Sequence, residues 1–354
     1  MALQEIRLIA PPDGAETKPL QRYYWPTDEE RKLSRADSPR GGGIAIQWDA
    51  LEMHGTDRSL PAGVLFEWEP LSASPGPAQY ELRISEQPEF RETLLLRDLD
   101  ENRVEVLHLH IATRYYWRVT ACLEGVRFAE SKTWSLLTHD ATPRWIAVPG
   151  MTNVRDLGGW PLPGGRRVRQ SMLYRSSEMN SHIVITEEGK HILMDNLRIR
   201  TDLDLRSPPE EVRPVLDARR VEWINIPIMP YAAICEPRFV DAYRRVFALL
   251  ADRSKYPLLF HCWGGADRAG TLAFLIGALL GKDMRHLARD YELTSLSIWG
   301  ERSRGSQEFQ ALLVALAAFD NGSGNVNRQV EQYLLHIGVT RQEIDRIRDL
   351  LITT

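Results

Sequence analysis

The 354-residue chain is poor in cysteine, has no long apolar run and carries little excess charge. Its three cysteines, Cys122, Cys235 and Cys262, are odd in number and far apart, which excludes a dense disulfide framework and favours a reducing compartment. No run of about eighteen apolar residues occurs, and the first residues show no basic-then-apolar signal pattern. We therefore expect a soluble, cytoplasmic protein without a transmembrane segment, unless a secretion signal has been trimmed.

The sequence also lacks the features of a nucleic-acid-binding or cofactor-binding protein. A net charge of −4 gives no general attraction to nucleic acid, so an anionic ligand has to be captured by a local site. His261 and Cys262 are adjacent but have no partners at the spacing of a zinc site. The glycines at 41–43 open no helical pattern, so they do not form a nucleotide-binding loop. We expect no metal ion, no cofactor and no nucleic-acid partner.

The length exceeds what one hydrophobic core usually serves, and this predicts a multidomain chain. Between residues 63 and 138, short alternating runs are separated by turn residues, a spacing typical of an all-β sandwich. Residues 17–61 are polar and glycine-rich and too long for a sandwich loop, so they form either an insertion or a partly disordered segment. The strands expected in this domain cover residues 64–68, 79–84, 93–96, 104–107, 115–122 and 133–137.

Beyond residues 143–149 the pattern changes to apolar runs that alternate with helical periodicity. This pattern predicts an α/β domain with a mostly parallel sheet flanked by helices, and a boundary that divides the chain into residues 1–140 and 141–354. The strands expected here cover residues 199–205, 221–226 and 257–260. The expected helices cover residues 238–251, 268–280, 284–297, 306–319, 326–336 and 340–352.

The most informative segment is Phe-His-Cys-Trp-Gly-Gly-Ala-Asp-Arg-Ala-Gly-Thr at residues 260–271, between a predicted buried strand and a predicted apolar helix. A helix N-terminus presents unpaired N–H groups and a positive dipole, which favour both a bound phosphate and a thiolate at Cys262. Five residues separate Cys262 from Arg268. The loop can therefore curl around a phosphoryl group that Arg268 grips with paired donors. Sulfur would attack phosphorus, and water would then hydrolyse the phosphocysteine.

The substrate-binding positions expected in this loop are Trp263, Gly264, Gly265 and Ala266. The two glycines permit positive φ angles and a close approach of the backbone to phosphate. Trp263 either packs behind the loop or forms an aromatic wall for the substrate. A single cysteine in such a turn is usually only a small buried residue, but the joint spacing of histidine, cysteine, arginine and glycine is hard to obtain by accident.

This segment is similar to the Cys-X5-Arg signature of protein tyrosine phosphatases. Residues 145–354 as a whole resemble the bacterial tyrosine/lipid phosphatase family, which has a secreted mycobacterial member. Further segments that support the resemblance are 153–159, 173–178, 202–207 and the closing helix at about 338–350. The resemblance implies a metal-independent phosphatase that acts on a phosphorylated protein or a small-molecule phosphate ester.

The N-terminal domain has a weaker resemblance of its own. Residues 113–119 resemble the late-strand signature of fibronectin type III domains, and residues 8–15 look like their opening strand and turn. The resemblance implies a fibronectin III-like sandwich that acts as a spacer, as part of the active-site wall, or as a module for a protein or carbohydrate partner.

An alkoxide is a poor leaving group, so hydrolysis of an alkyl ester needs a general acid. Tyrosine phosphatases usually take it from an aspartate on a mobile loop, but here the corresponding residues 226–236 contain no aspartate. Asp267 matches an aspartate that the resembled family carries in its phosphate loop, which makes it the first candidate, with Glu236 the second. A structural role for Asp267, such as orienting Arg268, is an equally open alternative.

Two alanines depart from the resembled pattern. Ala266 stands where the lipid-accepting members carry lysine, which makes activity on phosphoinositides less expected. Ala269 stands where the superfamily has a Ser or Thr hydroxyl that helps hydrolyse the phosphoenzyme, and Thr271 lies two residues too far along the chain. The principal hypothesis is a protein-tyrosine or dual-specificity phosphatase. The alternatives are a sugar, inositol or lipid phosphate phosphatase, and a phosphate-binding pseudophosphatase or scaffold with little turnover.

Several polar residues outside the loop are further candidates. Asn153, Arg155 and Asp156 form a cluster that lies either at the rim of the substrate site or behind the phosphate loop as a brace. Arg175 and Arg206 end predicted strands, where they either meet the substrate or form ordinary ion pairs.

Overall fold

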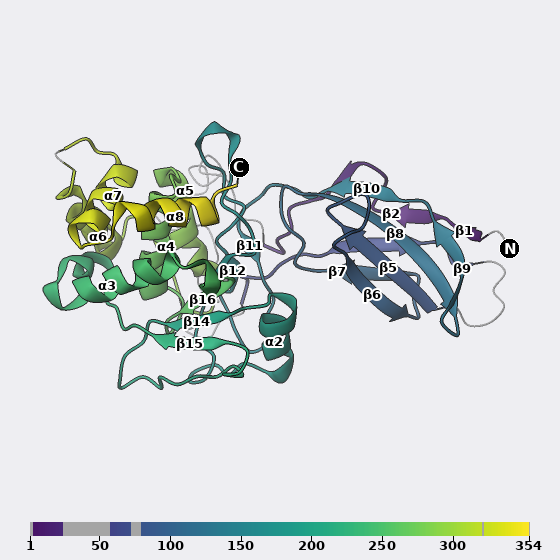
Figure 1. The fold of residues 1–354 in the computed structure, drawn as a ribbon, viewed down its shortest axis with the longest axis horizontal. Coiled ribbons are helices and arrows are strands. Elements are labelled where there is room, and N and C mark those ends of the chain that lie inside the picture. The colour runs from purple at the N-terminus through teal and green to yellow at the C-terminus, as the bar shows by residue number, and fades with distance from the viewer. Residues whose placement is uncertain (1–2, 24–56, 72–78, 321, 354) are drawn as a thin grey trace, which may run out of the picture. The chain divides into compact units, whose positions relative to one another are not determined.

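The computed structural model describes residues 3–23, 57–71, 79–320 and 322–353, and the chain divides into two compact units (Figure 1). The first unit comprises residues 1–21 and 61–144, and the second comprises residues 22–60 and 145–354. Most of the insertion expected at 17–61 lies outside the described residues. Its last residues belong to the second unit, where Ser59 Oγ accepts a hydrogen bond from the Asn153 amide at 3.1 Å. Within the described ranges, no helix combines the length and apolar character needed to cross a membrane.

The first unit is all β. Its strands are β1 (Gln4–Ile6), β2 (Leu8–Ala10), β3 (Ala15–Glu16), β4 (Val64–Trp68), β5 (Gln79–Ser85), β6 (Leu94–Leu99), β7 (Arg103–Val106), β8 (Arg114–Leu123), β9 (Val126–Ser131) and β10 (Trp134–Leu137). The six strands expected from the sequence are all present. Five of them have apolar residues at alternate positions, whereas β6 does not.

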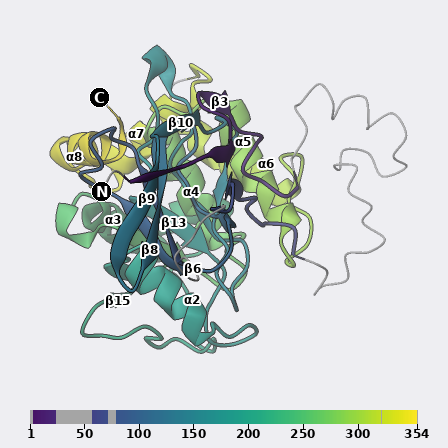
Figure 2. The same cartoon turned by 90° about the vertical axis from the view of Figure 1, so that its right-hand side faces the viewer.

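Two sheets form this unit. Strand β8 is the centre of the larger sheet and pairs with β5, β9 and β10, and Figure 2 shows β8 and β9 side by side. The smaller sheet has the order β2-β4-β7. Phe66 of the smaller sheet packs edge-on against Trp117 of the larger one, with ring centroids 4.9 Å apart, so the two sheets share one core. The unit is thus a β-sandwich, and its likeness to fibronectin type III domains stays a prediction.

The second unit mixes strands and helices. The strands of its sheet are β11 (Arg144–Trp145), β12 (Arg155–Asp156), β13 (Leu173–Ser176), β14 (Thr201–Asp204), β15 (Glu222–Asn225) and β16 (Leu258–His261), and β11 begins at the last residue of the first unit. Its α-helices are α2 (Glu187–His191), α3 (Pro237–Leu250), α4 (Arg268–Leu279), α5 (Met284–Glu292), α6 (Gln307–Ala317), α7 (Val326–His336) and α8 (Arg341–Leu351).

The sheet of this unit is mixed, with the order β11-β12-β13-β16-β14-β15. Strands β13, β16, β14 and β15 are parallel to one another, whereas β12 runs antiparallel to β13. The expectation of a mostly parallel sheet therefore needs correction. The two-residue strands β11 and β12 are too short to show a hydrophobic period, and nothing in the sequence signals their direction.

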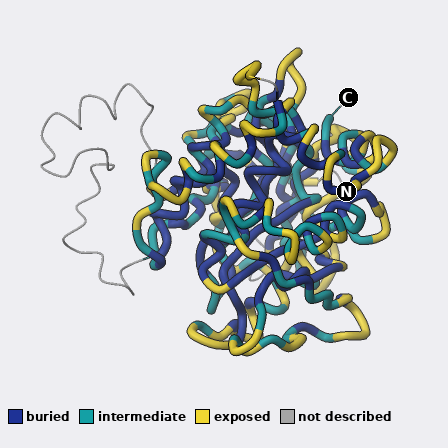
Figure 3. The backbone as a smooth tube through the Cα atoms, turned by 90° about the vertical axis from the view of Figure 1, so that its left-hand side faces the viewer, coloured by how far each residue is buried: buried dark blue, intermediate teal, exposed yellow. Residues whose placement is uncertain are grey.

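Alternate residues of the central strand β16 face two different cores. Leu258 and Phe260 belong to a large core that includes residues of helices α3 to α8, whereas Leu259 belongs to a smaller one with Leu193. Helix α2 lies apart from the group formed by α3 to α8 (Figure 1). Figure 3 shows that buried backbone fills the interior and that exposed backbone follows the outer loops.

Strand β16 and helix α4 together position the loop between them. Every residue of β16 is buried, and so is every residue of α4 after Arg268. A helix that is apolar on all sides has to lie inside its domain, which places the N-terminus of α4 against the sheet. Residues 262–267 therefore lie at the carboxyl end of the central strand, between the ends of β13 and β14.

Candidate active site

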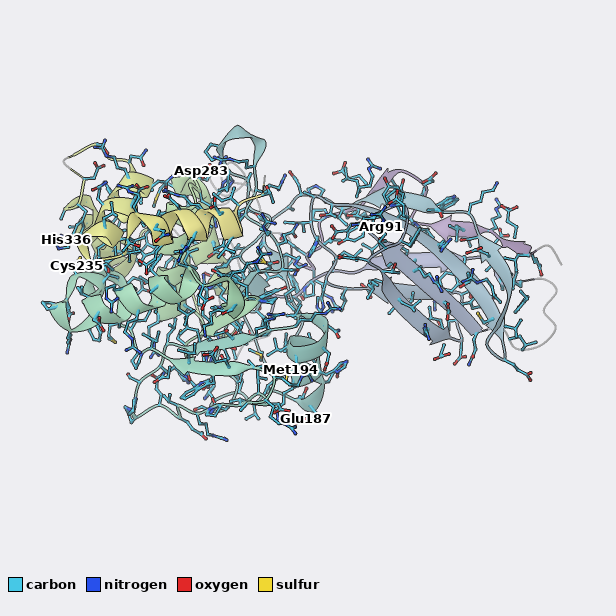
Figure 4. All side chains as sticks on the ribbon, in the orientation of Figure 1. Arg91, Glu187, Met194, Cys235, Asp283 and His336 are labelled. Carbon is cyan, nitrogen blue, oxygen red and sulfur yellow. The ribbon has the colours of Figure 1, made fainter. Side chains whose placement is uncertain are left out.

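Cys262 follows β16 directly, and its side chain is buried. All three cysteines are free thiols. Cys235 is exposed on the short 3-10 helix Tyr231–Cys235 (Figure 4), and Cys122 lies in β8 of the first unit. Only Cys262 therefore lies between the carboxyl end of a buried strand and the N-terminus of a buried helix, as the sequence motif predicts.

The carbonyl groups of residues 263–265 point out of the loop into hydrogen bonds. They accept, in order, from the amide of Glu178 at 2.9 Å, from Asn153 Nδ2 at 3.1 Å and from Arg175 Nη2 at 2.5 Å. In a trans peptide the C=O of one residue and the N–H of the next point in opposite directions. The amides of residues 264–266 therefore face the inside of the loop, where they form a cradle for an anion.

The glycines of the loop are required by close packing. Gly265 has φ +65°, and a Cβ atom there would lie 2.3 Å from the carbonyl oxygen of Ser176. A Cβ atom at Gly264 would lie 2.9 Å from the ring of Trp299. Ala266, the next position, has its small side chain buried. The positive φ expected at both glycines occurs at Gly265 but not at Gly264, where the close Trp299 ring, and not the backbone conformation, requires glycine.

Arg268 is held by a carboxylate at the mouth of the loop. Its Nη1 and Nη2 atoms donate to the two oxygens of Glu210 at 2.6 and 2.8 Å. Burial disfavours the charged guanidinium, but its hydrogen bonds to Glu210 and the nearby Cys262 sulfur outweigh burial and raise the pKa of Arg268 above its usual range. The arginine is thus charged, oriented and adjacent to the sulfur, as gripping a phosphoryl group requires.

A fully buried charge cluster supports the loop from behind. Arg155 and Arg175 are directly opposed on the antiparallel strands β12 and β13, an arrangement that is unfavourable for two like charges. Asp290 of α5 pairs with both, with Oδ1 2.9 Å from Arg155 Nε and Oδ2 2.8 Å from Arg175 Nη1. Burial opposes ionisation of Asp290, but the two arginines lower its pKa well below the usual range. The carboxylate therefore stays charged and fixes Arg175 against the loop.

The polar cluster at 153–156 fits the bracing alternative. Asn153 and Arg155 are fully buried, and Arg155 donates to Asn153 Oδ1 while Asn153 binds the loop carbonyl. Asp156 accepts hydrogen bonds from the amides of Gly158 and Ser171, each at 2.7 Å. These side chains point to neighbouring backbone and side chains, so a role in direct substrate contact stays a prediction without support in this geometry.

Arg206 and His261 complete the support. Arg206 is fully buried and pairs with Glu178 and Asp204, each at 2.8 Å, so it is an internal ion-pair residue. The amide of Glu178 holds the loop, and Arg206 therefore acts on the loop through Glu178. His261 Nε2 lies 3.1 Å from Asp202. Burial favours the neutral ring, but the Asp202 carboxylate prevails and raises the pKa of His261.

The structure places the two candidate acids differently. Asp267 lies at the end of the loop and pairs with Arg302, with its Oδ1 2.9 Å from Nε and its Oδ2 3.0 Å from Nη2. The Tyr231 hydroxyl also donates to Asp267 Oδ1. Glu236 is partly exposed and pairs with its neighbour Arg238 at 2.7 Å. Asp267 therefore belongs to the site, and Glu236 belongs to the start of α3.

Aromatic rings line one side of the loop. Trp263 remains 39% exposed, and its ring centroid lies 4.9 Å from that of Trp299. The ring of His182 lies 5.6 Å from each of the two indoles. The partial exposure favours an aromatic wall over packing behind the loop, because a residue behind the loop would be buried.

Residue 269, where the resemblance leads us to expect a hydroxyl, carries only a methyl group. Ala269 is fully buried in the first turn of α4. The Thr271 hydroxyl is also buried, and it accepts a hydrogen bond from the Tyr231 amide at 3.0 Å. Thr271 therefore positions the segment around Tyr231, and the concern about hydrolysis of a phosphoenzyme remains.

Sequence reasoning missed several residues of the site, among them Glu210, Tyr231, Asp290 and Arg302. They come from four separate segments of the chain, and each contacts its partner only after folding. Only Asp290 had a recognisable signal, since it shares the buried face of α5 with Leu287 and is a charged residue at an apolar position.

Comparison with known proteins identifies relatives of the second unit. A family profile described as "Tyrosine phosphatase family" matches residues 146–353. A protein of Cupriavidus necator named "Putative tyrosine-protein phosphatase H16_A0669" is 31% identical over 174 residues, which cover 41% of this chain and 61% of that protein. The chain thus spans about three-fifths of the length of this curated relative.

Two solved structures of a yeast protein also match. The core catalytic domain of the PP-IP phosphatase SIW14 from S. cerevisiae in complex with citrate is 14% identical, with a TM-score of 0.31, and the match covers 49% of this chain and 96% of that one. The Siw14 catalytic core is also 14% identical, with a TM-score of 0.32, and the match covers 55% and 98% of the two chains. TM-scores this low do not establish a shared fold.

Substituting Gly265 tests the backbone cradle. We expect Gly265→Ala to weaken the binding of inorganic phosphate at least about tenfold, because a Cβ atom collides with Ser176 and a φ of +65° is strained for alanine. Titration calorimetry measures the affinity. Gly305→Ala is the matched control, since its Cβ atom would meet only Ser303 Oγ at 3.6 Å. Equal phosphate affinity in both variants would contradict the cradle.

Substituting Asp290 tests the buried charge cluster. Asp290→Asn should lower the free energy of unfolding by about 3–5 kcal/mol at neutral pH, because it leaves two opposed buried arginines without a carboxylate. The pKa of Asp290 is depressed in the folded state, so its contribution is complete above the unfolded pKa of about 3.9 and is lost below it. The difference between wild type and variant should therefore shrink below about pH 4. Urea unfolding at several pH values measures the difference in the free energy of unfolding, and Asp349→Asn, at an exposed aspartate, is the control. A difference that does not change with pH would contradict this role of Asp290.

Proposed function

The chain belongs to the tyrosine phosphatase family, and from this premise we propose that it hydrolyses phosphate monoesters through a phosphocysteine intermediate on Cys262. The observation that supports this most directly is the loop at residues 262–268. Its carbonyls are held outward, its amides face inward, and its arginine lies beside the sulfur. Such an arrangement stabilises the charge of a phosphoryl group during transfer.

In the proposed reaction the Cys262 thiolate attacks phosphorus. The S–P bond forms as the P–O bond to the leaving group breaks, and the leaving oxygen takes up a proton when it departs. Arg268 and the loop amides bind the phosphoryl oxygens throughout. Water then attacks phosphorus, which breaks the S–P bond and releases inorganic phosphate. Asp267 is the candidate for the leaving-group proton expected from the sequence, and it can fill this role only in its protonated form.

We propose phosphotyrosine or a mixed set of phosphorylated side chains as the substrate. The partly exposed Trp263, packed against Trp299 and His182, supports this choice, because its indole offers a face for a phenyl ring beside the phosphate. Ala266 adds no cation to the loop, which disfavours ligands with several phosphates. For the N-terminal unit we propose a fibronectin III-like module that binds a protein or carbohydrate.

A second candidate function is phosphate binding with little turnover. It is favoured by the buried methyl group of Ala269 and by the engagement of the Thr271 hydroxyl with the Tyr231 amide. Because Ala269 has no hydroxyl to stabilise the departing thiolate, hydrolysis of the phosphoenzyme would be slow. The two functions differ in whether the first turnover is followed by steady release of product.

Substituting the proposed nucleophile tests the reaction. Cys262→Ser should abolish phosphate release from 4-nitrophenyl phosphate, because a serine hydroxyl stays protonated at neutral pH and is a weak nucleophile. Release is followed with the first turnover resolved and with a chelator present. Steady, chelator-insensitive turnover by the wild type supports the phosphatase, whereas a stoichiometric burst that then stalls supports the binding function. Undiminished activity in the serine variant would exclude the proposed nucleophile.

Substituting Glu210 tests the orientation of Arg268. Glu210→Gln should lower kcat/KM at least about tenfold, since an amide cannot accept hydrogen bonds on both of its atoms and the guanidinium loses its fixed direction. Glu211→Gln is the matched control, because Glu211 is the next residue and pairs with the exposed Arg213. A Glu210→Gln rate equal to or above that of the wild type would mean that Glu210 competes with the substrate for Arg268.

A further inference from the structure

Asp267 does not do what an aspartate at the start of a helix usually does. It occupies the N-cap position of α4, where an aspartate normally accepts a hydrogen bond from an amide of the first turn. Its side chain makes no such bond. Instead, both carboxylate oxygens face Arg302, in a bidentate pair with distances of 2.9 and 3.0 Å. The carboxylate beside the phosphate loop is thus committed to an arginine from another segment.

Arg302 is itself held in place. Its amide donates to Ser295 Oγ at 2.8 Å, and the same hydroxyl donates back to the Arg302 carbonyl at 3.1 Å. Its Nη1 atom donates to the carbonyls of Trp299 at 3.3 Å and Glu301 at 2.9 Å. The guanidinium therefore has little freedom to leave Asp267, because every one of its nitrogen atoms is in use.

Tyr231 adds a third donor to the same carboxylate. Its hydroxyl donates to Asp267 Oδ1 and lies 2.8 Å from the hydroxyl of Tyr291. Its backbone has φ +60°, a conformation that is costly for a bulky residue, and its amide is anchored to Thr271 Oγ1. A strained residue persists only where the surroundings require it, and here its strain brings the hydroxyl to Asp267.

These donors favour the ionised form of Asp267. Burial raises the pKa of the carboxyl, but the hydrogen bonds and charge of Arg302, the Tyr231 hydroxyl and the charge of Arg268 prevail and lower it below the usual value of 3.8. The pKa of Tyr231 is raised by its burial and by Asp267, and that of Tyr291 is raised chiefly by its burial. The Tyr231 and Tyr291 hydroxyls therefore stay protonated and do not transfer a proton to the Asp267 carboxylate.

An ionised carboxylate cannot protonate a departing oxygen. While Asp267 is paired with Arg302, the leaving group has to depart as an anion or take its proton from water. A phenolate departs as an anion far more readily than an alkoxide does, since the phenol of tyrosine has a pKa of about 10 and an alcohol has a much higher pKa. The pair between Arg302 and Asp267 therefore affects which esters the site can hydrolyse, because it disfavours esters with strongly basic leaving groups.

We propose that Arg302 is a positioning residue that holds Asp267 as a carboxylate and thereby makes the site discriminate strongly in favour of esters with weakly basic leaving groups. Tyr231 supports the same state through its hydrogen bond. The proposal rests on the phosphatase function of Cys262. It goes beyond that function by assigning leaving-group selectivity to an arginine that lies outside the phosphate loop.

The test is the dependence of rate on the leaving group. Wild-type full chain is assayed with 4-nitrophenyl phosphate, phenyl phosphate and an alkyl phosphate of similar size, between pH 5 and 7. We expect kcat/KM to fall steeply as the leaving group becomes more basic. Arg302→Met should flatten this dependence at the acid end, because the freed, buried Asp267 can then be protonated and act as an acid. The aryl-to-alkyl ratio should fall at least about tenfold, within the usual contribution of a general acid.

Three further variants isolate the cause. The double variant Arg302→Met/Asp267→Asn should lose the gain on the alkyl ester, because the acid is absent. Tyr231→Phe should change the ratio in the same direction but less, since it removes one donor and leaves the Arg302 pair. If Arg302→Met unfolds the surrounding loop, Tyr231→Phe and Arg302→Lys replace it in the test. Arg302→Lys keeps the positive charge but cannot form the bidentate pair with Asp267, so it too should lower the aryl-to-alkyl ratio. Arg285→Met, at a largely exposed arginine, is the control and should leave the ratio unchanged.

The outcomes separate this proposal from the function on which it rests. Without Cys262-dependent hydrolysis of 4-nitrophenyl phosphate, the proposed function itself fails. With that hydrolysis present, a shallow dependence on the leaving group in wild type overturns the role of Arg302. A selective loss on the alkyl ester in Asp267→Asn alone also overturns it, because Asp267 would then be donating a proton with the pair closed.

Discussion

The organisation of the site depends on one buried carboxylate between two buried arginines. Arg155 and Arg175 face each other across strands β12 and β13, and two like charges in that position would separate the strands without Asp290. Asp290 comes from α5, so the same ion pairs join the helix layer to the sheet. Arg175 extends from this cluster to the carbonyls of the phosphate loop. The inward direction of the loop amides therefore depends on a charge balance located behind the loop.

Two carboxylate–arginine pairs flank the loop and have opposite consequences for the chemistry. Glu210 holds Arg268, so the carboxylate orients the cation that we propose to bind the phosphoryl group. Arg302 holds Asp267, so the cation restrains a carboxylate that would otherwise be free to take up a proton. Phosphate binding and proton donation are thus controlled by separate contacts. The loop can therefore be well formed for phosphate binding while proton donation is restrained.

Sequence patterns predicted most of the longer elements of the fold but not the two-residue strands β11 and β12. Helix α4 and strand β8 have enough residues for a period to be visible, and both lie within two residues of their expected limits. The two-residue strands β11 and β12 carry no period, and the sheet was wrongly expected to be mostly parallel because the antiparallel β12 was not foreseen. The alternation of apolar and polar residues also could not show that residues 57–60 belong to the second unit, since their membership depends on contacts with distant residues.

The sequence by itself identified the proposed nucleophile, the arginine proposed to bind phosphate and the need for glycine between them, because Cys262, Gly265 and Arg268 lie within one short strand–loop–helix segment. The chemistry of such a segment follows from local backbone geometry, which neighbouring residues specify. Only the tertiary structure decided the partners Glu210, Asp290 and Arg302, since each comes from a distant part of the chain. Whether a charged side chain binds substrate, braces a loop or restrains an acid depends on what folding places within about 3 Å of it, and no pattern of neighbours in the sequence contains that information.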